Sequence, residues 1–308
     1  MATTKRIWLS LSPGEIEGLP EGPEYGHWDG EEELPPGIED VEFFVPPYVK
    51  GERAVPLLRR MRRLRVVQTL TAGVDNLLPH IPDGVTLCNA RGVHEASTAE
   101  LALTLVLSSL RGVPRFVRGQ DAERWYAGFY PALADRTVLI VGYGAIGSAI
   151  EDRLTPFECD VERVARTART TERGPVRPHD DLPHLLPRAD VVIVVTPLTE
   201  ATRGLVDAGF LARMKDGALL VNVSRGAVVD TGALLRELEA GRLHAAVDVT
   251  DPEPLPPGHP LWHAPNILIS PHVGGSSTAF LPRARRLVRA QVRRYLSEEP
   301  LENVIVMS

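Results

Sequence analysis

Short β-branched apolar runs, bounded by glycine, proline and acidic residues, recur through the second half of the 308-residue chain. Such runs are typical of strands buried on both faces of a parallel sheet. Helix-compatible segments lie between them, such as Ala208–Met214, which Asp207 can cap, and the segment that Asp230 or Thr231 can cap before Gly241. Strands alternating with helices predict a parallel sheet with helices on both faces. The predicted strands are a run from Thr137, then Val161–Ala165, Val191–Val195, Ala218–Val223, Ala245–Val249 and Ile267–Ser270.

The first half of the chain has a similar but less regular pattern. Arginines on one face of Leu57–Leu64 predict a helix with a solvated basic side. Ser12–Asp40, which includes Glu31–Glu33, is rich in Gly, Pro and Glu and is predicted to be an exposed loop, with a flexible lid as the less favoured alternative. The predicted strands are Ile7–Leu11, Val41–Val45, Val66–Leu70 and Val85–Asn89.

Two long helical patterns suit a two-domain chain, which the length also favours. The segment from His94 to Leu110 is apolar on most faces, as expected of a buried helix that connects domains. Thr278–Ser297 has apolar residues at helical spacing and can return the chain to its N-terminal part.

Three glycines follow the strand that begins at Thr137. Gly142, Gly144 and Gly147 have the G-x-G-x-x-G spacing, between a predicted strand and a predicted helix. The first glycine permits a tight turn, the second lets a pyrophosphate approach the backbone, and the third lets helix and strand pack closely. The N–H groups at the start of the helix can bind the phosphates. This context predicts a dinucleotide site.

Composition and charge exclude several classes of protein. The net charge of −6 and a pI near 5.9 argue against a general nucleic-acid-binding protein. Cys88 and Cys159 have no metal-ligand spacing and suggest neither a metal site nor a disulfide framework. The N-terminus has no secretory pattern and no apolar run is long enough to span a membrane, so we expect a cytoplasmic protein.

Polar residues follow the later strands, where ligands of open parallel sheets bind. Arg225 follows one strand, Glu253 comes after the next, and His272 follows the last. An arginine can bind a carboxylate through two hydrogen bonds, and a histidine oriented by a glutamate can transfer a proton. Beside a dinucleotide motif, this set predicts hydride transfer on a carboxylated ketone.

The chain resembles the D-isomer-specific 2-hydroxyacid dehydrogenases along nearly its whole length. The matching stretches are Thr71–Asn76, Ser97–Leu101, Val141–Gly147, Thr196–Thr199, Val221–Asp230, Asp248–Leu255 and Ser270–Gly275. The resemblance implies an α/β fold with two Rossmann-like parallel-sheet domains, the cofactor domain (101–277) being inserted into a discontinuous substrate domain (1–100 and 278–308). It also implies a cleft at their junction and a homodimer formed through the cofactor domain.

The resemblance further implies roles for individual residues. Arg225 binds the substrate carboxylate and keto oxygen, His272 is the acid/base, and Glu253 is its partner. Asp248 faces the nicotinamide carboxamide. The backbone donors to the substrate are those of Ala72, Gly73 and Val74. The implied cofactor-binding residues are Gly142, Gly144, Ala145, Ile146, Gly147, Thr196, Pro197, Val223, Ser224, Asp248 and Gly274.

The residues after the second strand of the cofactor half bear on the choice of cofactor. NAD-specific sites place an acid there for the ribose 2′-hydroxyl, but this position falls on Ala165 or Arg166. Arg166 and Thr167, with Arg169 nearby, can instead bind a 2′-phosphate. NADP(H) is therefore favoured, with NAD(H) as the alternative.

The substrate is predicted to be a small 2-keto acid such as glyoxylate or hydroxypyruvate. The loop at Thr71–Val74 lacks the lysine that would suggest a phosphite dehydrogenase, and Glu253 stands where formate dehydrogenases carry glutamine. A phosphoglycerate dehydrogenase is less favoured because the chain lacks a long C-terminal extension. An NAD(H)-sensing corepressor, which binds partner peptides, is kept as the alternative from a different class.

Overall fold

The computed structural model describes residues 4–31 and 33–306, which form two compact units. The discontinuous unit consists of Met1–His94 and Thr278–Ser308, and the inserted unit consists of Glu95–Ser277. The chain therefore enters and leaves the inserted unit once each. The expected boundary after residue 100 falls inside α2 (Glu95–Leu110), which belongs to the inserted unit along its whole length.

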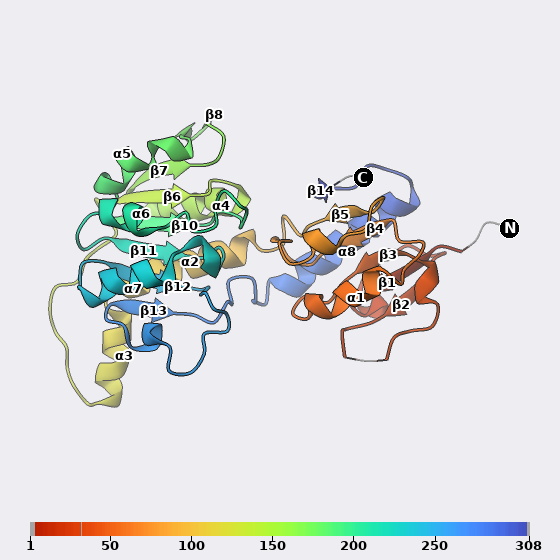
Figure 1. The fold of residues 1–308 in the computed structure, drawn as a ribbon, viewed down its shortest axis with the longest axis horizontal. Helices are drawn as coiled ribbons and strands as arrows, with labels where there is room; N and C mark the ends of the chain where they lie inside the picture. The colour runs from red at the N-terminus through yellow and green to blue at the C-terminus, as the bar shows by residue number, and fades with distance from the viewer. Residues whose placement is uncertain (1–3, 32, 307–308) are drawn as a thin grey trace. The chain divides into compact units, whose positions relative to one another are not determined.

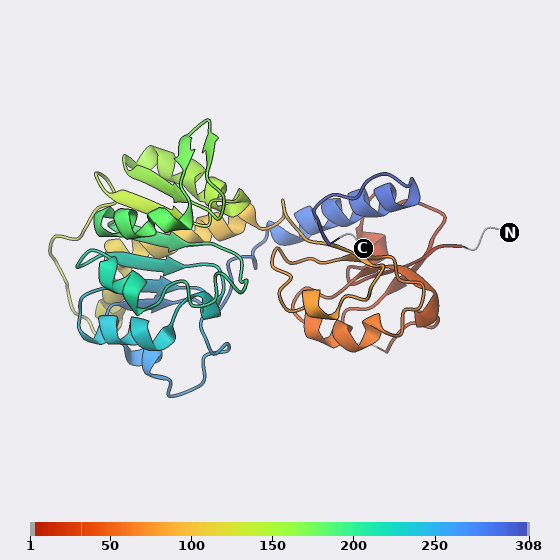
Figure 2. The same ribbon diagram turned by 45° about the horizontal axis from the view of Figure 1, so that its top comes forward.

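The discontinuous unit contains a six-stranded sheet in the order β14-β5-β4-β3-β1-β2, parallel except for the antiparallel strand β14. Helix α8 (Phe280–Leu296) packs Leu287, Val288 and Val292 against one face, where Phe43 is also buried. The short helix α1 (Val55–Leu58) packs on the other face, and Figure 2 shows α8 and α1 on opposite sides of the sheet. The strands are β1 (Arg6–Leu9), β2 (Glu24–His27), β3 (Val41–Val45), β4 (Val66–Gln68), β5 (Thr86–Cys88) and β14 (Val304–Val306).

Two expectations for the discontinuous unit were wrong. The segment 12–40 is not all loop, because β2 pairs with β1 from Arg6↔Glu24 to Leu9↔His27. A Cβ at Gly26 would lie 2.4 Å from the Trp8 ring, so only a glycine fits at this position of the strand. In the sequence, the same glycine indicates a loop. The helix expected over Leu57–Leu64 ends at Leu58, after which the chain turns and buries Met61. Residue 32 of the acidic run lies outside the described residues.

The inserted unit contains a fully parallel sheet in the order β13-β12-β11-β10-β6-β7, as Figure 1 shows. Helices α2 and α4 (Ala145–Leu154) share one buried core, and α5 (Leu182–Leu185), α6 (Ala208–Arg213) and α7 (Thr231–Glu239) share the other. The strands are β6 (Thr137–Val141), β7 (Asp160–Val164), β10 (Val191–Val194), β11 (Leu219–Asn222), β12 (His244–Val247) and β13 (Ile267–Ile269). The predicted α/β class with two parallel-sheet units is confirmed.

The predicted caps are confirmed, and three further elements appear. The Asp207 carboxylate accepts from Phe210 N at 2.7 Å, and the Asp230 carboxylate accepts from Ala233 N at 2.8 Å. The pattern did not predict helix α3 (Val113–Asp121) or the hairpin of β8 (Arg169–Thr171) and β9 (Gly174–Val176). None of the helices in the described ranges is long and apolar enough to cross a membrane.

Candidate active site

The glycine loop joins β6 to α4, and each of its three glycines has a distinct steric setting. Gly142 has a φ of 106°, and a Cβ there would lie 2.5 Å from Thr196 N. A Cβ on Gly147 would lie 2.9 Å from Gly142 O, so the helix packs tightly on the loop. A Cβ on Gly144 would have no atom within 4 Å, which leaves this part of the backbone open to a ligand.

The loop lies where the strand order reverses. Strand β6 has the next strand in sequence, β7, on one side and β10 on the other. Open α/β sheets bind nucleotides at such a point, outside the carboxyl ends of the strands. Ala145 and Ile146 open α4 with no side-chain cap, and Thr196 and Pro197 follow β10 at the same edge. These residues fit the pyrophosphate of a dinucleotide.

The end of β7 is attached directly to the glycine loop. Gly142 N and Tyr143 N both donate to Val164 O at 2.9 Å. The next residues are the half-buried Ala165 and the exposed Arg166 and Thr167, and no carboxylate occurs before β8 begins. An adenosine ribose placed along this turn would meet positive rather than negative charge.

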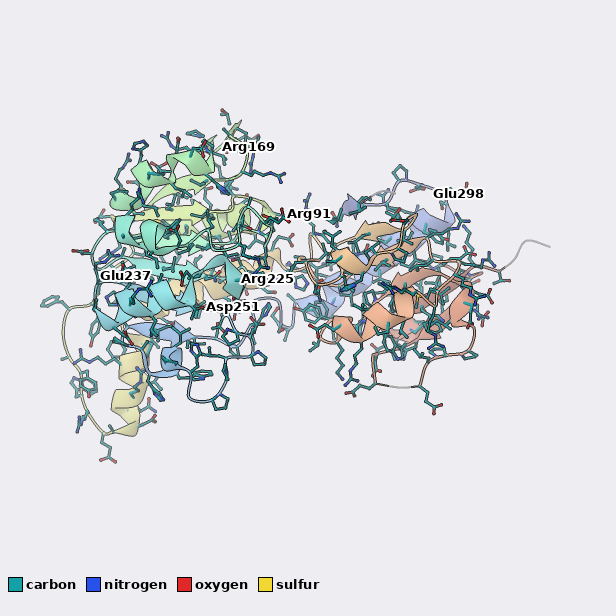
Figure 3. The ribbon with its side chains drawn as sticks, in the orientation of Figure 1. Arg91, Arg169, Arg225, Glu237, Asp251 and Glu298 are labelled. Carbon is teal, nitrogen blue, oxygen red and sulfur yellow. The ribbon has the colours of Figure 1, made fainter. Side chains whose placement is uncertain are left out.

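Asn222 fixes the backbone on both sides of Arg225. Its Oδ1 accepts from Ser224 N at 3.0 Å and from Ser224 Oγ at 2.7 Å, and its Nδ2 donates to Arg225 O at 3.1 Å. A Cβ on Gly226 would lie 1.9 Å from Thr250 O, so this turn packs against the residues that follow β12. Arg225 and Asp251 accordingly lie at one edge of the inserted unit, as Figure 3 shows.

His272 and Glu253 form a hydrogen-bonded pair. His272 Nδ1 lies 2.5 Å from Glu253 Oε1, and about two-fifths of each side chain is exposed. The Glu253 hydrogen bond raises the pKa of His272 despite the opposing effect of burial. Burial alone would raise the pKa of Glu253, but His272, a backbone N–H and Arg225 outweigh it and lower that pKa. The pair therefore favours a charged imidazolium beside a carboxylate.

The charge of Arg225 reaches both members of this pair. It lowers the pKa of Glu253, and it opposes the rise in the pKa of His272. The structure thus brings together the arginine, glutamate and histidine that were expected to converge. With Nδ1 facing Glu253, Nε2 is the ring nitrogen that can serve a substrate.

Asp248 holds the backbone around His272. Its carboxylate is buried and accepts from Ser270 Oγ at 2.7 Å and from the N–H groups of Val273 and Gly274 at 2.9 Å. Its own carbonyl accepts from His272 N at 2.7 Å, and His272 has a φ of 52°. Ser270 and Asn222 were not predicted as positioning residues, and polar residues at strand ends were the only signal for them.

The loop Ala72–Val74 follows β4 in the discontinuous unit and is held by side chains. Asn89 Nδ2 donates to Ala72 O at 2.8 Å, and Thr71 Oγ1 donates to Gly73 O at 2.7 Å. These bonds hold the loop in place, and no acceptor among the described residues takes the N–H groups of Ala72, Gly73 and Val74. A ligand could therefore use them as donors.

Comparison with known proteins identifies the family. The family model "D-isomer specific 2-hydroxyacid dehydrogenase, NAD binding domain" matches residues 103–274. The chain belongs to the D-isomer-specific 2-hydroxyacid dehydrogenases. It is 37% identical to a mouse glyoxylate reductase/hydroxypyruvate reductase over 233 residues, which cover 70% of this chain and 68% of that protein. It is 31% identical to an Arabidopsis thaliana formate dehydrogenase over 275 residues, which cover 85% and 71%.

A solved structure extends the likeness to the whole fold. The NADPH-dependent glyoxylate/hydroxypyruvate reductase of Sinorhizobium meliloti, in complex with NADP and sulfate, superposes with a TM-score of 0.82 at 26% identity and covers 98% of each chain. This dehydrogenase family member is therefore an NAD(P)-dependent oxidoreductase that acts on the CH–OH group of donors.

Proposed function

We propose that this dehydrogenase reduces a small 2-keto acid, such as glyoxylate or hydroxypyruvate, to the D-2-hydroxy acid. The observation that supports this most directly is the His272–Glu253 pair within the electrostatic reach of Arg225, at the edge that carries the glycine loop. A cation for a carboxylate and a proton donor for a keto oxygen are the groups that this reduction needs.

Each residue has a defined part in the proposed reaction. Arg225 binds the substrate carboxylate, while the N–H groups of Ala72, Gly73 and Val74 donate to the substrate. The nicotinamide cofactor, when bound, supplies a hydride to the keto carbon. His272 delivers its Nε2 proton to the keto oxygen, and Glu253 stabilises the charged imidazolium before that transfer. In the oxidation direction, neutral His272 accepts the same proton.

The proposed cofactor is NADP(H), with NAD(H) as the alternative. Arg166 and Thr167 occupy the turn after β7 where NAD-specific sites place an acid. The S. meliloti relative, NADPH-dependent by name and bound to NADP in its structure, supports this choice. Val223, Ser224 and Gly274 lie at the same sheet edge and are proposed to contact the bound cofactor, as is Asp248 toward the carboxamide.

We also propose a homodimer, formed through the inserted unit. Helix α3 and the segment after it expose apolar side chains, with Val117 55%, Trp125 96% and Phe129 107% exposed. Beside α3, a cavity of about 500 Å³ opens between this helix and the starts of β11, β12 and β13. Aromatic side chains and an adjacent hollow on the same unit suit a self-complementary, two-fold contact.

The test of the activity is NADPH oxidation followed at 340 nm (the absorbance band of reduced nicotinamide) with a panel of keto acids. We expect turnover with glyoxylate or hydroxypyruvate, and weaker turnover with phosphohydroxypyruvate. A corepressor-like protein would bind the cofactor without steady turnover of any acid. A formate dehydrogenase would instead reduce NAD⁺ with formate, and that result would contradict the proposal.

A further inference from the structure

Tyr143, between the first two glycines of the loop, has its side chain buried beneath the loop. The residue is 5% exposed, and its hydroxyl donates to Glu151 Oε2 on α4, a residue that is 6% exposed. The turn itself needs only the glycines, so a buried tyrosine–glutamate pair at this place has another role.

Arg163 on β7 completes the buried pair. Its Nε donates to Glu151 Oε2 at 2.8 Å, and its Nη2 donates to Oε1 of the same carboxylate. Its guanidinium carbon lies 5.8 Å from the centre of the Tyr143 ring. Burial alone would raise the pKa of Glu151, but bonds from Arg163 and Tyr143 outweigh it and lower that pKa. Glu151 is therefore an ionised, bidentate anchor between α4, β7 and the glycine loop.

The β8–β9 hairpin attaches to the same cluster through two arginines. Arg173, in the hairpin turn, donates to Ser148 O at 3.1 Å, pairs with Asp152 and lies 3.9 Å from Glu151 Oε2. Arg169 donates from Nη2 to Tyr143 O, and its guanidinium carbon lies 5.9 Å from the Tyr143 ring centre. Figure 3 shows Arg169 at this margin of the inserted unit.

The arginines of this region differ in how their charge is compensated. Four of them pair with carboxylates within the described residues, namely Arg163, Arg173, Arg177 and Arg188. Arg169 donates to the carbonyls of Tyr143 and Thr167, and it pairs with no carboxylate in the part of the chain that the structure describes. Arg166 is exposed and has no carboxylate within ion-pair distance among those residues. Two uncompensated cations thus remain beside the end of β7, where the adenosine ribose of a dinucleotide is held.

We infer that Tyr143 and Glu151 are positioning residues for recognition of the cofactor 2′-phosphate. They hold the hairpin against the glycine loop so that Arg169, together with Arg166, presents its remaining N–H groups to the phosphate. This inference rests on the proposed use of NADP(H). The buried cluster of Tyr143, Glu151 and Arg163 would then help to select NADP(H) over NAD(H). The loop glycines do not make this selection, because they face the pyrophosphate that both cofactors share.

The test compares adenosine 2′,5′-bisphosphate with 5′-AMP, which differ only in the 2′-phosphate, by isothermal titration calorimetry. We expect the wild-type chain to bind the bisphosphate at least about tenfold more tightly, because the 2′-phosphate can accept charge-assisted hydrogen bonds that 5′-AMP cannot. Arg169→Met should remove most of this ratio. Tyr143→Phe, which keeps the ring, should reduce the ratio several-fold and leave 5′-AMP affinity unchanged.

Arg188→Met is the matched control, because it removes one exposed arginine of the same region and should leave the ratio unchanged. Glu151→Gln is a second variant, with thermal unfolding recorded for each protein to identify loss of the fold. A wild-type ratio near one would overturn the use of NADP(H) and this inference with it, while leaving keto-acid reduction with NADH intact. A high wild-type ratio that a folded Tyr143→Phe and a folded Glu151→Gln both preserve would overturn the positioning role alone.

Discussion

At the scale of single residues, the site depends on pairs whose members change each other's charge. Glu253 raises the pKa of His272, and Arg225 acts on both groups. The types and order of these three residues could be predicted because each follows a predicted strand. The parts of Asn222 and Ser270 could not, because they depend on hydrogen bonds that only the folded loops create.

Replacing Glu253 tests whether this carboxylate raises the pKa of His272, and the pH dependence of the rate is the measurement. Reduction needs protonated His272, so the rate should fall as the pH rises through the pKa of that imidazole. Glu253→Gln removes the carboxylate that raises this pKa, and the alkaline fall in kcat should therefore move to lower pH. In the oxidation direction, the same substitution should allow activity at lower pH than in the wild type.

The control for this profile is Glu239→Gln, an exposed position on α7, which should leave the midpoint unchanged. A Glu253→Gln profile that coincides with the wild-type profile would show that Glu253 does not set the protonation of His272.

At the scale of elements, strand ends and the turns after them determine the site. The buried strands of both sheets were predictable because parallel strands require continuous apolar runs. Strand β2 was missed because Gly26, which makes room for Trp8, is a loop signal in the sequence. Helix α3 was missed because its nine residues include Pro114 and Gly119, which usually interrupt a helical pattern. The hairpin β8–β9 was missed because Arg169–Val176 has no apolar alternation.

The turn after β13 allows an element-scale prediction. Ser270 Oγ is one of three donors to the carboxylate of Asp248, which holds the backbone on either side of His272. Ser270→Ala should lower kcat by about fivefold, the equivalent of a hydrogen bond of about 1 kcal/mol, with the KM for the keto acid, which Arg225 is proposed to bind, nearly unchanged. Ser270→Thr, which keeps the hydroxyl, should restore most of the rate. Equal kcat values for the wild type and the alanine variant would contradict a positioning role for this serine.

At the scale of the whole molecule, the chain consists of two units of similar topology, joined by two crossings. In each sheet, the second strand along the chain (β2 or β7) is the edge strand beside the first (β1 or β6). The next strand of the sheet (β3 or β10) lies on the other side of that first strand. The chain length, the glycine motif and the family resemblance all predict a division into two units. The exposure of apolar side chains on α3 could not be predicted, because an exposed apolar helix has the same sequence pattern as a buried one.

The homodimer is tested by sedimentation velocity of the wild type and a Trp125→Ser/Phe129→Ser variant. The wild type is expected at twice the 33.7 kDa chain mass, and the variant should be mainly monomeric at micromolar concentration. Val49→Ser, at an 83% exposed position in the discontinuous unit, is the control and should remain dimeric. A monomeric wild type, or a double variant that stays fully dimeric, would rule out this interface.

The most direct test of the account is the rate of glyoxylate reduction by NADPH in the wild type and in His272→Ala, together with cofactor affinity. We predict steady turnover by the wild type and a loss of at least about 100-fold in kcat for His272→Ala, the usual contribution of a general acid. NADPH affinity, measured by fluorescence titration, should stay within about twofold, because His272 hydrogen bonds to Glu253 and not to the glycine loop. Turnover that survives unchanged in His272→Ala would contradict the assignment of this histidine as the proton donor.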